Sequence, residues 1–200
     1  MIEMLHKLMN KSRLFIATVF GLVLLTGYSH AADWASILMY HRFGEQDYPS
    51  TNIRMEQFRE HLEELKKDKY TVLPLGEIVD KLKSGAVLPD RSVAITIDDA
   101  YLSVYENAWP LLKEAGFPFT IFVSTDNLDQ KMPAFMNWAQ LKEMADQGVY
   151  VGHHTASHAH LPRLSADKLK EEIERASESF KKKSGICSGT VCLPLRGIWI

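Results

Sequence analysis

Two adjacent carboxylates follow an apolar run in this chain of 200 residues. Residues 93–97 are apolar and β-branched, as in a strand buried on both faces, and Asp98 and Asp99 come next. Neighbouring carboxylates repel each other, which raises the pKa of one of them, and a bound cation relieves the repulsion. Alternatively, Asp99 only caps the following helix, since aspartate is a favoured N-cap residue.

Four histidines lie close together at the end of another expected strand, at positions 153, 154, 158 and 160. His154 and His158 are four residues apart, so one helical turn or a tight loop puts both rings on one side. Neutral imidazoles in that arrangement bind zinc and similar ions. The alternative is a polar loop that is rich in histidine by accident.

Residues 154–158, "HTASH", lack the glutamate of the zinc-protease helix motif, which disfavours that class of enzyme. One carboxylate and two imidazoles would form a three-ligand set with positions open for water and substrate. Such open sets are typical of catalytic metal sites rather than structural ones.

Strand-like and helix-like segments alternate through the chain and must position these groups. Strands are predicted at 36–41, 70–74, 92–98, 119–125 and 149–155, and helices at 55–68, 75–85, 101–116 with a kink near Pro110, 136–148 and 165–185. This alternation predicts an α/β fold with a mostly parallel sheet, and favours a barrel over an open sheet. Active residues gather at the C-terminal ends of such strands, where both clusters lie.

Composition restricts the class of partner. The formal net charge is −2 and 46% of the residues are hydrophobic, which suits one domain with a substantial core. The single basic cluster, residues 181–183, is expected on a solvated helix face. Nucleic acid is therefore not expected as a partner.

The first 31 residues have the order of a secretory signal peptide. Lys7, Lys11 and Arg13 precede an uncharged run at 14–27, and small residues allow cleavage after Ala31. A membrane anchor is the alternative, but the run is shorter than the roughly 20 residues that a spanning helix needs. We therefore expect a secreted or periplasmic protein without a stable membrane span.

Two motifs carry a family resemblance. Residues 96–100, "TIDDA", are similar to the motif T-F-D-D-G, and residues 154–158 are similar to H-[ST]-x-x-H. Together with "MYHRF" at 39–43 and "GFPFTIFV" at 116–123, they make the chain resemble the polysaccharide deacetylases, which have a NodB homology domain of carbohydrate esterase family 4 type. The resemblance implies a distorted (β/α) barrel, of which residues 32–187 would supply the N-terminal part.

The resemblance also implies roles for single residues. Asp98 would be the catalytic general base, and Asp99, His154 and His158 would bind a divalent metal, expected to be zinc. The metal would polarise the carbonyl of an N-acetyl group on an exported polysaccharide, and water would release acetate and leave an amine. The alternatives are an O-acetyl esterase acting on xylan-like glycans and a non-catalytic remnant that binds metal or glycan.

Other candidates have weaker support. His41 ends the first strand and could face the site, whereas His153 could point to the other side of its strand. Trp109 and Trp138 could stack on sugar rings, although aromatic residues at helical spacing are more often part of the core. Tyr101 lies next to the carboxylates and could contact substrate.

The sequence departs from the family pattern at two places. Ala100 replaces the usual glycine, which is a mild change if the backbone φ there is negative. No later family motif is recognisable, and residues 188–199 can be encoded by codons that, read one nucleotide later, give a peptide containing "FAYPYG", which is similar to the third motif of the family. Residues 188–200 are therefore expected to be an out-of-frame tail of a truncated chain, with Cys192 an artefact rather than a disulfide partner of Cys187. Because the late general acid of the family is missing, departure of the amine, and so the activity of this chain, is expected to be impaired.

Overall fold

The computed structural model describes residues 33–183 and the backbone of residues 190–191. The predicted signal peptide at 1–31 lies outside the described residues, as do Cys187, Cys192 and most of the predicted out-of-frame tail. No helix of the described part combines the length and apolar character needed to cross a membrane.

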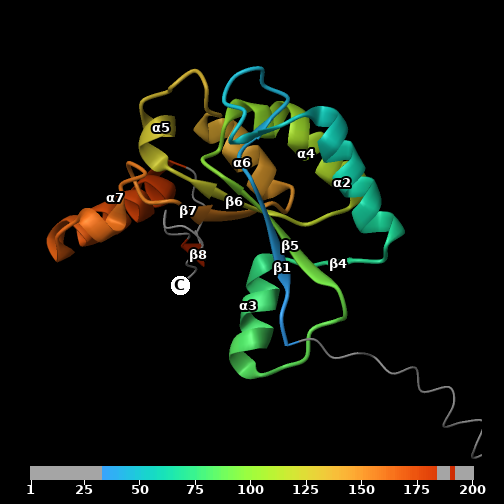
Figure 1. Ribbon diagram of the computed structural model, residues 1–200. Helices are drawn as coiled ribbons and strands as arrows, with labels where there is room; N and C mark the ends of the chain where they lie inside the picture. Colours follow the sequence, from blue (N-terminus) through green and yellow to red (C-terminus); the bar gives the residue numbers. More distant parts are fainter. Residues whose placement is uncertain (1–32, 184–189, 192–200) are drawn as a thin grey trace, which may run out of the picture. The chain divides into compact units, whose positions relative to one another are not determined.

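A parallel sheet forms the centre of the described structure (Figure 1). Its strands run in the order β1 (Ser36–Tyr40), β5 (Ser92–Asp98), β6 (Thr120–Val123), β7 (Tyr150–His153) and β8 (Thr190–Val191), and β4 (Thr71–Val72) pairs with the start of β5. All these pairs are parallel. The predicted α/β fold with a mostly parallel sheet is confirmed.

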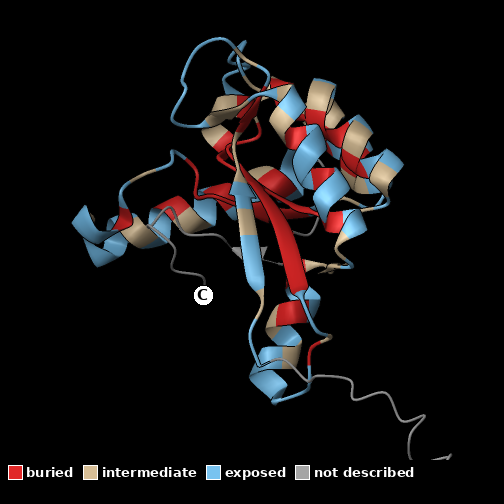
Figure 2. Cartoon of the chain, turned by 45° about the vertical axis from the view of Figure 1, so that its right-hand side comes forward, coloured by how far each residue is buried: buried red, intermediate tan, exposed pale blue. Residues whose placement is uncertain are grey.

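β5 explains the apolar run that precedes the two carboxylates. All seven of its residues are buried, because it pairs with β1 and β6 and both of its faces are covered (Figure 2). A strand in this position needs apolar side chains on both faces. It delivers Asp98 to the C-terminal edge of the sheet, as expected.

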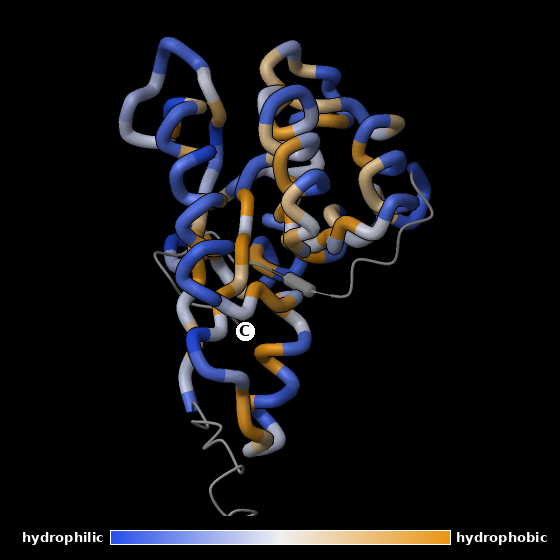
Figure 3. Tube along the Cα trace, turned by 90° about the vertical axis from the view of Figure 1, so that its right-hand side faces the viewer, coloured by the Kyte–Doolittle hydropathy of each residue, from blue (hydrophilic) through white to orange (hydrophobic). Residues whose placement is uncertain are grey.

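Helices cover the two faces of the sheet unequally. α2 (Met55–Lys67), α4 (Trp109–Ala115) and α6 (Trp138–Asp146) pack on one face around Ile95, Ile97 and Ile121. α3 (Leu75–Ser84) packs on the opposite face, where Leu75 and Ile78 meet Ala94 and Phe122. Figure 3 shows that hydrophobic and hydrophilic residues alternate along the chain, as expected for helices that turn one face toward a core and one toward solvent.

Most predicted helices are found within a few residues of their expected bounds. The exception is the helix predicted at 101–116, which divides into a π-helical turn, η1 (Val104–Ala108), and α4. Pro110 has no N–H to donate to the preceding turn of the helix. The kink predicted near this residue is therefore observed as a wider, π-helical turn directly before α4. The sequence did not predict α5 (Thr125–Asp129), the 3₁₀ turn η2 (Leu161–Arg163), or the short parallel pair β2 (Arg42–Phe43) and β3 (Asn52–Ile53).

α7 (Ala166–Lys183) begins after its predicted cap. The amide of Lys168 donates to Ser165 Oγ over 3.4 Å, and the amide of Leu169 donates to the Ser165 carbonyl over 2.9 Å. α7 packs beside α5, and its Phe180 ring meets Trp138 of α6 edge-on at 5.3 Å. The last described helix is thus attached to the body of the domain by α5 and α6.

Asn137 caps α6 and gives a stability prediction. Its side chain accepts from the amides of Ala139 and Gln140, while the Gln140 side chain accepts from the Asn137 amide, which completes a capping box. Replacing Asn137 by alanine should therefore lower the free energy of unfolding by about 1 kcal/mol, measured by urea denaturation. Lys142→Ala, which removes an exposed ion pair from the same helix, should cost less than about 0.5 kcal/mol, and an equal loss in both variants would contradict the prediction.

Candidate metal centre

The two carboxylates lie where β5 turns sharply into the following segment. Asp98 and Asp99 are 4% and 8% exposed. Asp99 and Ala100 both have left-handed backbones, with φ of 72° and 59°. The Ala100 carbonyl accepts from the Met136 amide over 3.1 Å, which helps to hold this turn in place.

The condition under which alanine at position 100 would be a mild change, a negative φ, is therefore not met. The turn after β5 must reverse direction within two residues, and left-handed φ values are the way this backbone does so. A non-glycine residue with this conformation costs about 1–2 kcal/mol. The substitution of alanine for the glycine usual in the family motif is thus a strained one, and the buried surroundings of Ala100 over-determine its conformation.

Two histidines from the loop after β7 meet Asp99. The Nε2 atoms of His154 and His158 lie 4.0 Å and 3.4 Å from Asp99 Oδ1. The two imidazole rings are 4.7 Å apart and nearly perpendicular, and the three candidate ligand atoms all lie within 4.8 Å of one another. The fold thus brings together residues from two strand ends that are more than fifty positions apart in the sequence.

These residues fit a divalent metal ion. Asp99 Oδ1 is buried and has no hydrogen-bond partner among the described residues, so it does not serve as a helix cap there. Two ligands of one zinc ion, each about 2.0–2.2 Å from it, are separated by at most about 4.3 Å, and both Asp99-to-histidine distances are within that limit. A buried, unsatisfied carboxylate oxygen that faces two imidazole nitrogens is the donor set that zinc and similar ions prefer.

Asp98 stands beside this triad with a different environment. Burial, and after it the neighbouring Asp99 carboxylate, raise the pKa of Asp98 to about 7. Its Oδ1 is also buried without a hydrogen-bond partner among the described residues. A carboxyl group with this pKa can exchange protons near neutrality, which is the property of a general base.

His41 and Arg42 come directly after β1, which runs parallel to β5. Burial lowers the pKa of His41, the Asp99 carboxylate opposes that effect, and His158 and Arg42 lower the pKa further, so His41 lies within electrostatic range of two triad residues. The Arg42 guanidinium lies 3.5 Å from the ring centre of Tyr101 and 4.2 Å from that of Tyr48.

Arg42 was not identified from the sequence, nor was Tyr48. Glu45 pairs with the Arg42 guanidinium at 2.5 Å and accepts from Ser103 Oγ at 2.6 Å, so the arginine is held by both charge and rings. The signals for Arg42 were its place next to His41 after a strand and its inclusion in the family-like segment "MYHRF". Nothing in the sequence marks Tyr48, because its contact depends on how the 44–51 loop folds back.

None of the remaining candidates is one of the three converging ligand residues of the described part of the chain. His153 is the last residue of β7 and is buried, and burial lowers its pKa. Trp109 belongs to the main core, and Trp138 packs on Phe180 while its Nε1 donates to Asp129 over 3.0 Å. The core interpretation therefore holds for Trp109, and Trp138 is engaged in packing. Burial, and after it the Asp99 carboxylate, raise the pKa of Tyr101, and its ring stacks on Phe135 at 4.7 Å.

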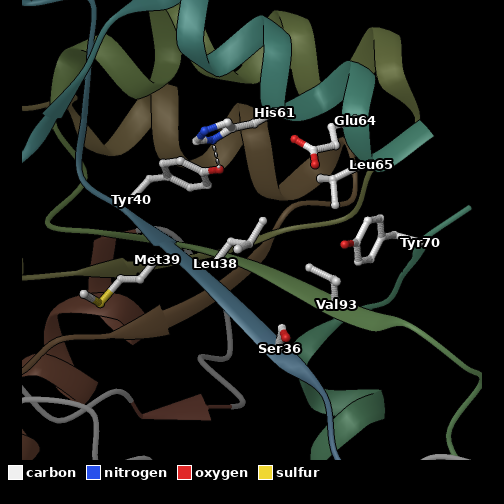
Figure 4. A pocket seen from close by; sticks show the side chains of 9 residues that line it. All are labelled: Ser36, Leu38, Met39, Tyr40, His61, Glu64, Leu65, Tyr70 and Val93. Carbon is white, nitrogen blue, oxygen red and sulfur yellow. Dashed lines mark hydrogen bonds between the residues drawn. The ribbon is translucent and has the colours of Figure 1, made fainter. Parts of the chain in front are cut away.

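The cavities alone do not locate this site. A groove of about 430 Å³ lies between β1 and α2, where Tyr40 and His61 form a hydrogen bond of 2.9 Å (Figure 4). None of its lining residues belongs to the triad. A smaller cavity of about 240 Å³ is lined by His41, Arg42 and residues of the 50–53 segment. It includes the two basic residues described above but no ligand of the triad.

Comparison with known proteins gives a consistent result. The family model described as polysaccharide deacetylase matches residues 85–198. YxkH of Bacillus subtilis (strain 168) is 29% identical over 144 residues, which cover 72% of this chain and 50% of that protein. The poly-beta-1,6-N-acetyl-D-glucosamine N-deacetylase of Staphylococcus aureus (strain N315) is 28% identical over 152 residues, which cover 74% and 51%. The chain thus spans about half the length of these relatives.

Two solved structures match over more of their own length. The structure of IcaB from Ammonifex degensii superposes with a TM-score of 0.71 at 26% identity, covering 82% of this chain and 75% of that one. The de-N-acetylase from Aggregatibacter actinomycetemcomitans superposes with a TM-score of 0.67 at 21% identity, covering 80% and 79%, and supports the fold alone.

Proposed function

Since this chain belongs to the polysaccharide deacetylase family, we propose that it is part of a metal-dependent hydrolase that removes N-acetyl groups from an exported polysaccharide. One observation carries the proposal: three candidate metal ligands, Asp99, His154 and His158, converge beside a buried carboxyl group with a pKa raised to about 7. The name of the Staphylococcus aureus relative supports an N-acetylglucosamine polymer as the substrate class. The signal-like pattern of residues 1–31 supports a site of action outside the cytoplasm.

The mechanism assigns separate tasks to the two neighbouring carboxylates. Asp99, His154 and His158 would hold the ion, which we propose to be zinc, and a bound zinc ion would polarise the acetyl carbonyl and make water more acidic. Asp98 accepts the proton of the water that attacks the carbonyl carbon. The bond between carbonyl carbon and nitrogen then breaks, the nitrogen takes up the proton that Asp98 accepted and leaves as a free amine, and the acyl group leaves as acetate.

Burial of the site supports this division of tasks. Asp98 and Asp99 are almost fully buried, so their charges act in a medium of lower dielectric constant than water. Two unpaired carboxylates in such a place would be costly, but a cation on Asp99 compensates one charge and leaves Asp98 free for proton transfer. In this proposal each of the two adjacent carboxylates at the end of β5 has its own role, one in metal binding and one in proton transfer.

The test is acetate release by the zinc-loaded chain. We expect acetate from β-1,6-linked N-acetylglucosamine oligomers, detected by an enzyme-coupled assay, and none after removal of the metal with a chelator. Acetate from acetylated xylan but not from the amide substrate would favour the O-acetyl esterase. Zinc binding at the triad without acetate release from either substrate would favour a non-catalytic binder.

A further inference from the structure

The loop that carries the two histidine ligands has a backbone that needs support. Thr155 and His158 both have left-handed φ values, 64° and 59°, although neither is glycine. Such conformations persist only where the surrounding structure imposes them. The side chain of His158 is 49% exposed, so its own packing does little to fix it. The question is which contacts hold this loop in the conformation that brings His158 to Asp99.

The first half of the loop is held by the backbone of neighbouring elements. The His154 amide donates to the Val123 carbonyl of β6 over 2.8 Å. The amide of Asp126, in α5, donates to the Ala156 carbonyl over 2.9 Å. These bonds fix residues 154–156, but they end two residues before His158.

The second half of the loop is held by one side chain from α7. Glu172 accepts a hydrogen bond from the Ser157 amide over 2.8 Å and another from Ser157 Oγ over 3.0 Å. Each of its two carboxylate oxygens takes one of these bonds. Glu172 is 8% exposed, although it is a charged residue in a helix whose other glutamates are exposed. Charged side chains are rarely buried unless they are paired, so the two hydrogen bonds from Ser157 account for the burial of Glu172.

α7 is itself fixed where Glu172 projects from it. Arg175 pairs with Asp126 of α5 at 2.5 Å and approaches Glu172 to 3.8 Å, which partly offsets the buried negative charge. One turn further on, Ser179 donates to Asp129 of α5 over 2.8 Å. The same short helix therefore anchors α7 and the first half of the histidine loop.

We propose that Glu172 is a positioning residue of the metal centre. It holds Ser157 by two hydrogen bonds and thereby keeps the adjacent His158 in the strained conformation that faces Asp99. The inference rests on the proposed metal site of Asp99, His154 and His158. Groups that orient metal ligands commonly change metal affinity by about 10–100-fold when they are removed.

The experiment measures metal affinity directly, in the full chain, without reference to activity. Co²⁺ is titrated into the protein, and its visible absorption spectrum reports both the affinity and the ligand geometry. Glu172→Ala should weaken Co²⁺ binding about 10-fold or more and alter the spectrum. Glu172→Gln should restore most of the affinity, because the amide oxygen can accept from the Ser157 N–H and the NH₂ group can donate to Ser157 Oγ.

The controls separate positioning from general loss of structure. Glu174→Ala removes an exposed glutamate that pairs only with Lys170 in α7, and it should leave Co²⁺ binding unchanged. Ser157→Ala removes one of the two hydrogen bonds from an exposed residue and should weaken binding about 3-fold, a smaller loss than that of Glu172→Ala. This variant decides the matter if Glu172→Ala does not fold, as judged by circular dichroism.

The outcomes are distinct. Wild-type Co²⁺ affinity and spectrum in folded Glu172→Ala, or in Ser157→Ala if only that variant folds, would overturn the inference. Equal losses in Glu172→Gln and Glu172→Ala would overturn it too, because the hydrogen bonds would then not be the cause. If Co²⁺ binding is the same in the wild-type chain and in His158→Ala, the proposed metal site itself fails. Loss of binding in His158→Ala alone would leave that site standing and reject only the role of Glu172.

Discussion

Replacing Asp98 by asparagine should lower the rate of acetate release by about 10²–10⁴-fold while leaving zinc affinity nearly unchanged. The amide has almost the same shape as the carboxyl group, but it cannot accept a proton from the attacking water. General base catalysis contributes an effect of that size. Asp98 is also not one of the three converging ligand atoms, so the metal should still bind. Acetate release gives the first quantity, and zinc titration by calorimetry gives the second.

The matched control for this variant is Asp80→Asn, which makes the same chemical change at an exposed position of α3. It should alter neither quantity. An Asp98→Asn protein that releases acetate at the control's rate would remove Asp98 from the mechanism. An Asp98→Asn protein that has lost zinc would instead make Asp98 a ligand, and the division of tasks between the two carboxylates would be wrong.

The sequence was sufficient to predict the long elements and the convergence of the candidate ligands. β5 was predicted from 92 to 98 because a strand between two neighbours must be apolar on both faces, and that pattern is unambiguous. The parallel topology then puts the ends of β5 and β7 at one edge of the sheet, separated only by β6. Topology therefore predicts that the carboxylate pair and the histidine cluster lie close together, whereas the choice of Asp99 rather than Asp98 as the candidate ligand came from the family resemblance.

The parts that sequence did not predict depend on docking rather than on local pattern. α7 contains several glutamates of identical chemistry, and only its packing against α5 decides that Glu172 is the one that reaches Ser157. α5 is five residues long, too short for a periodic pattern to appear. The left-handed turn at Ala100 was missed because alanine gives no sign of it, whereas glycine would have.

Replacing His158 by alanine should weaken zinc binding by more than about 100-fold and abolish acetate release. Loss of a direct ligand should exceed the 10–100-fold effect that the loss of an orienting group produces. Because His158 is half exposed, the alanine variant should fold, whereas His154→Ala would also leave a buried cavity.

Melting temperature measures zinc binding without reference to activity. Free zinc at 100 times its dissociation constant should stabilise the wild-type chain by about 2.7 kcal/mol, or roughly 5–10 °C. His158→Ala should show no such shift at that concentration, while His160→Ala, an exposed histidine of the same loop outside the triad, should show it in full. Zinc stabilisation that persists in His158→Ala would mean that the ion binds elsewhere, and the mechanism built on Asp99 and the two histidines would fail with it.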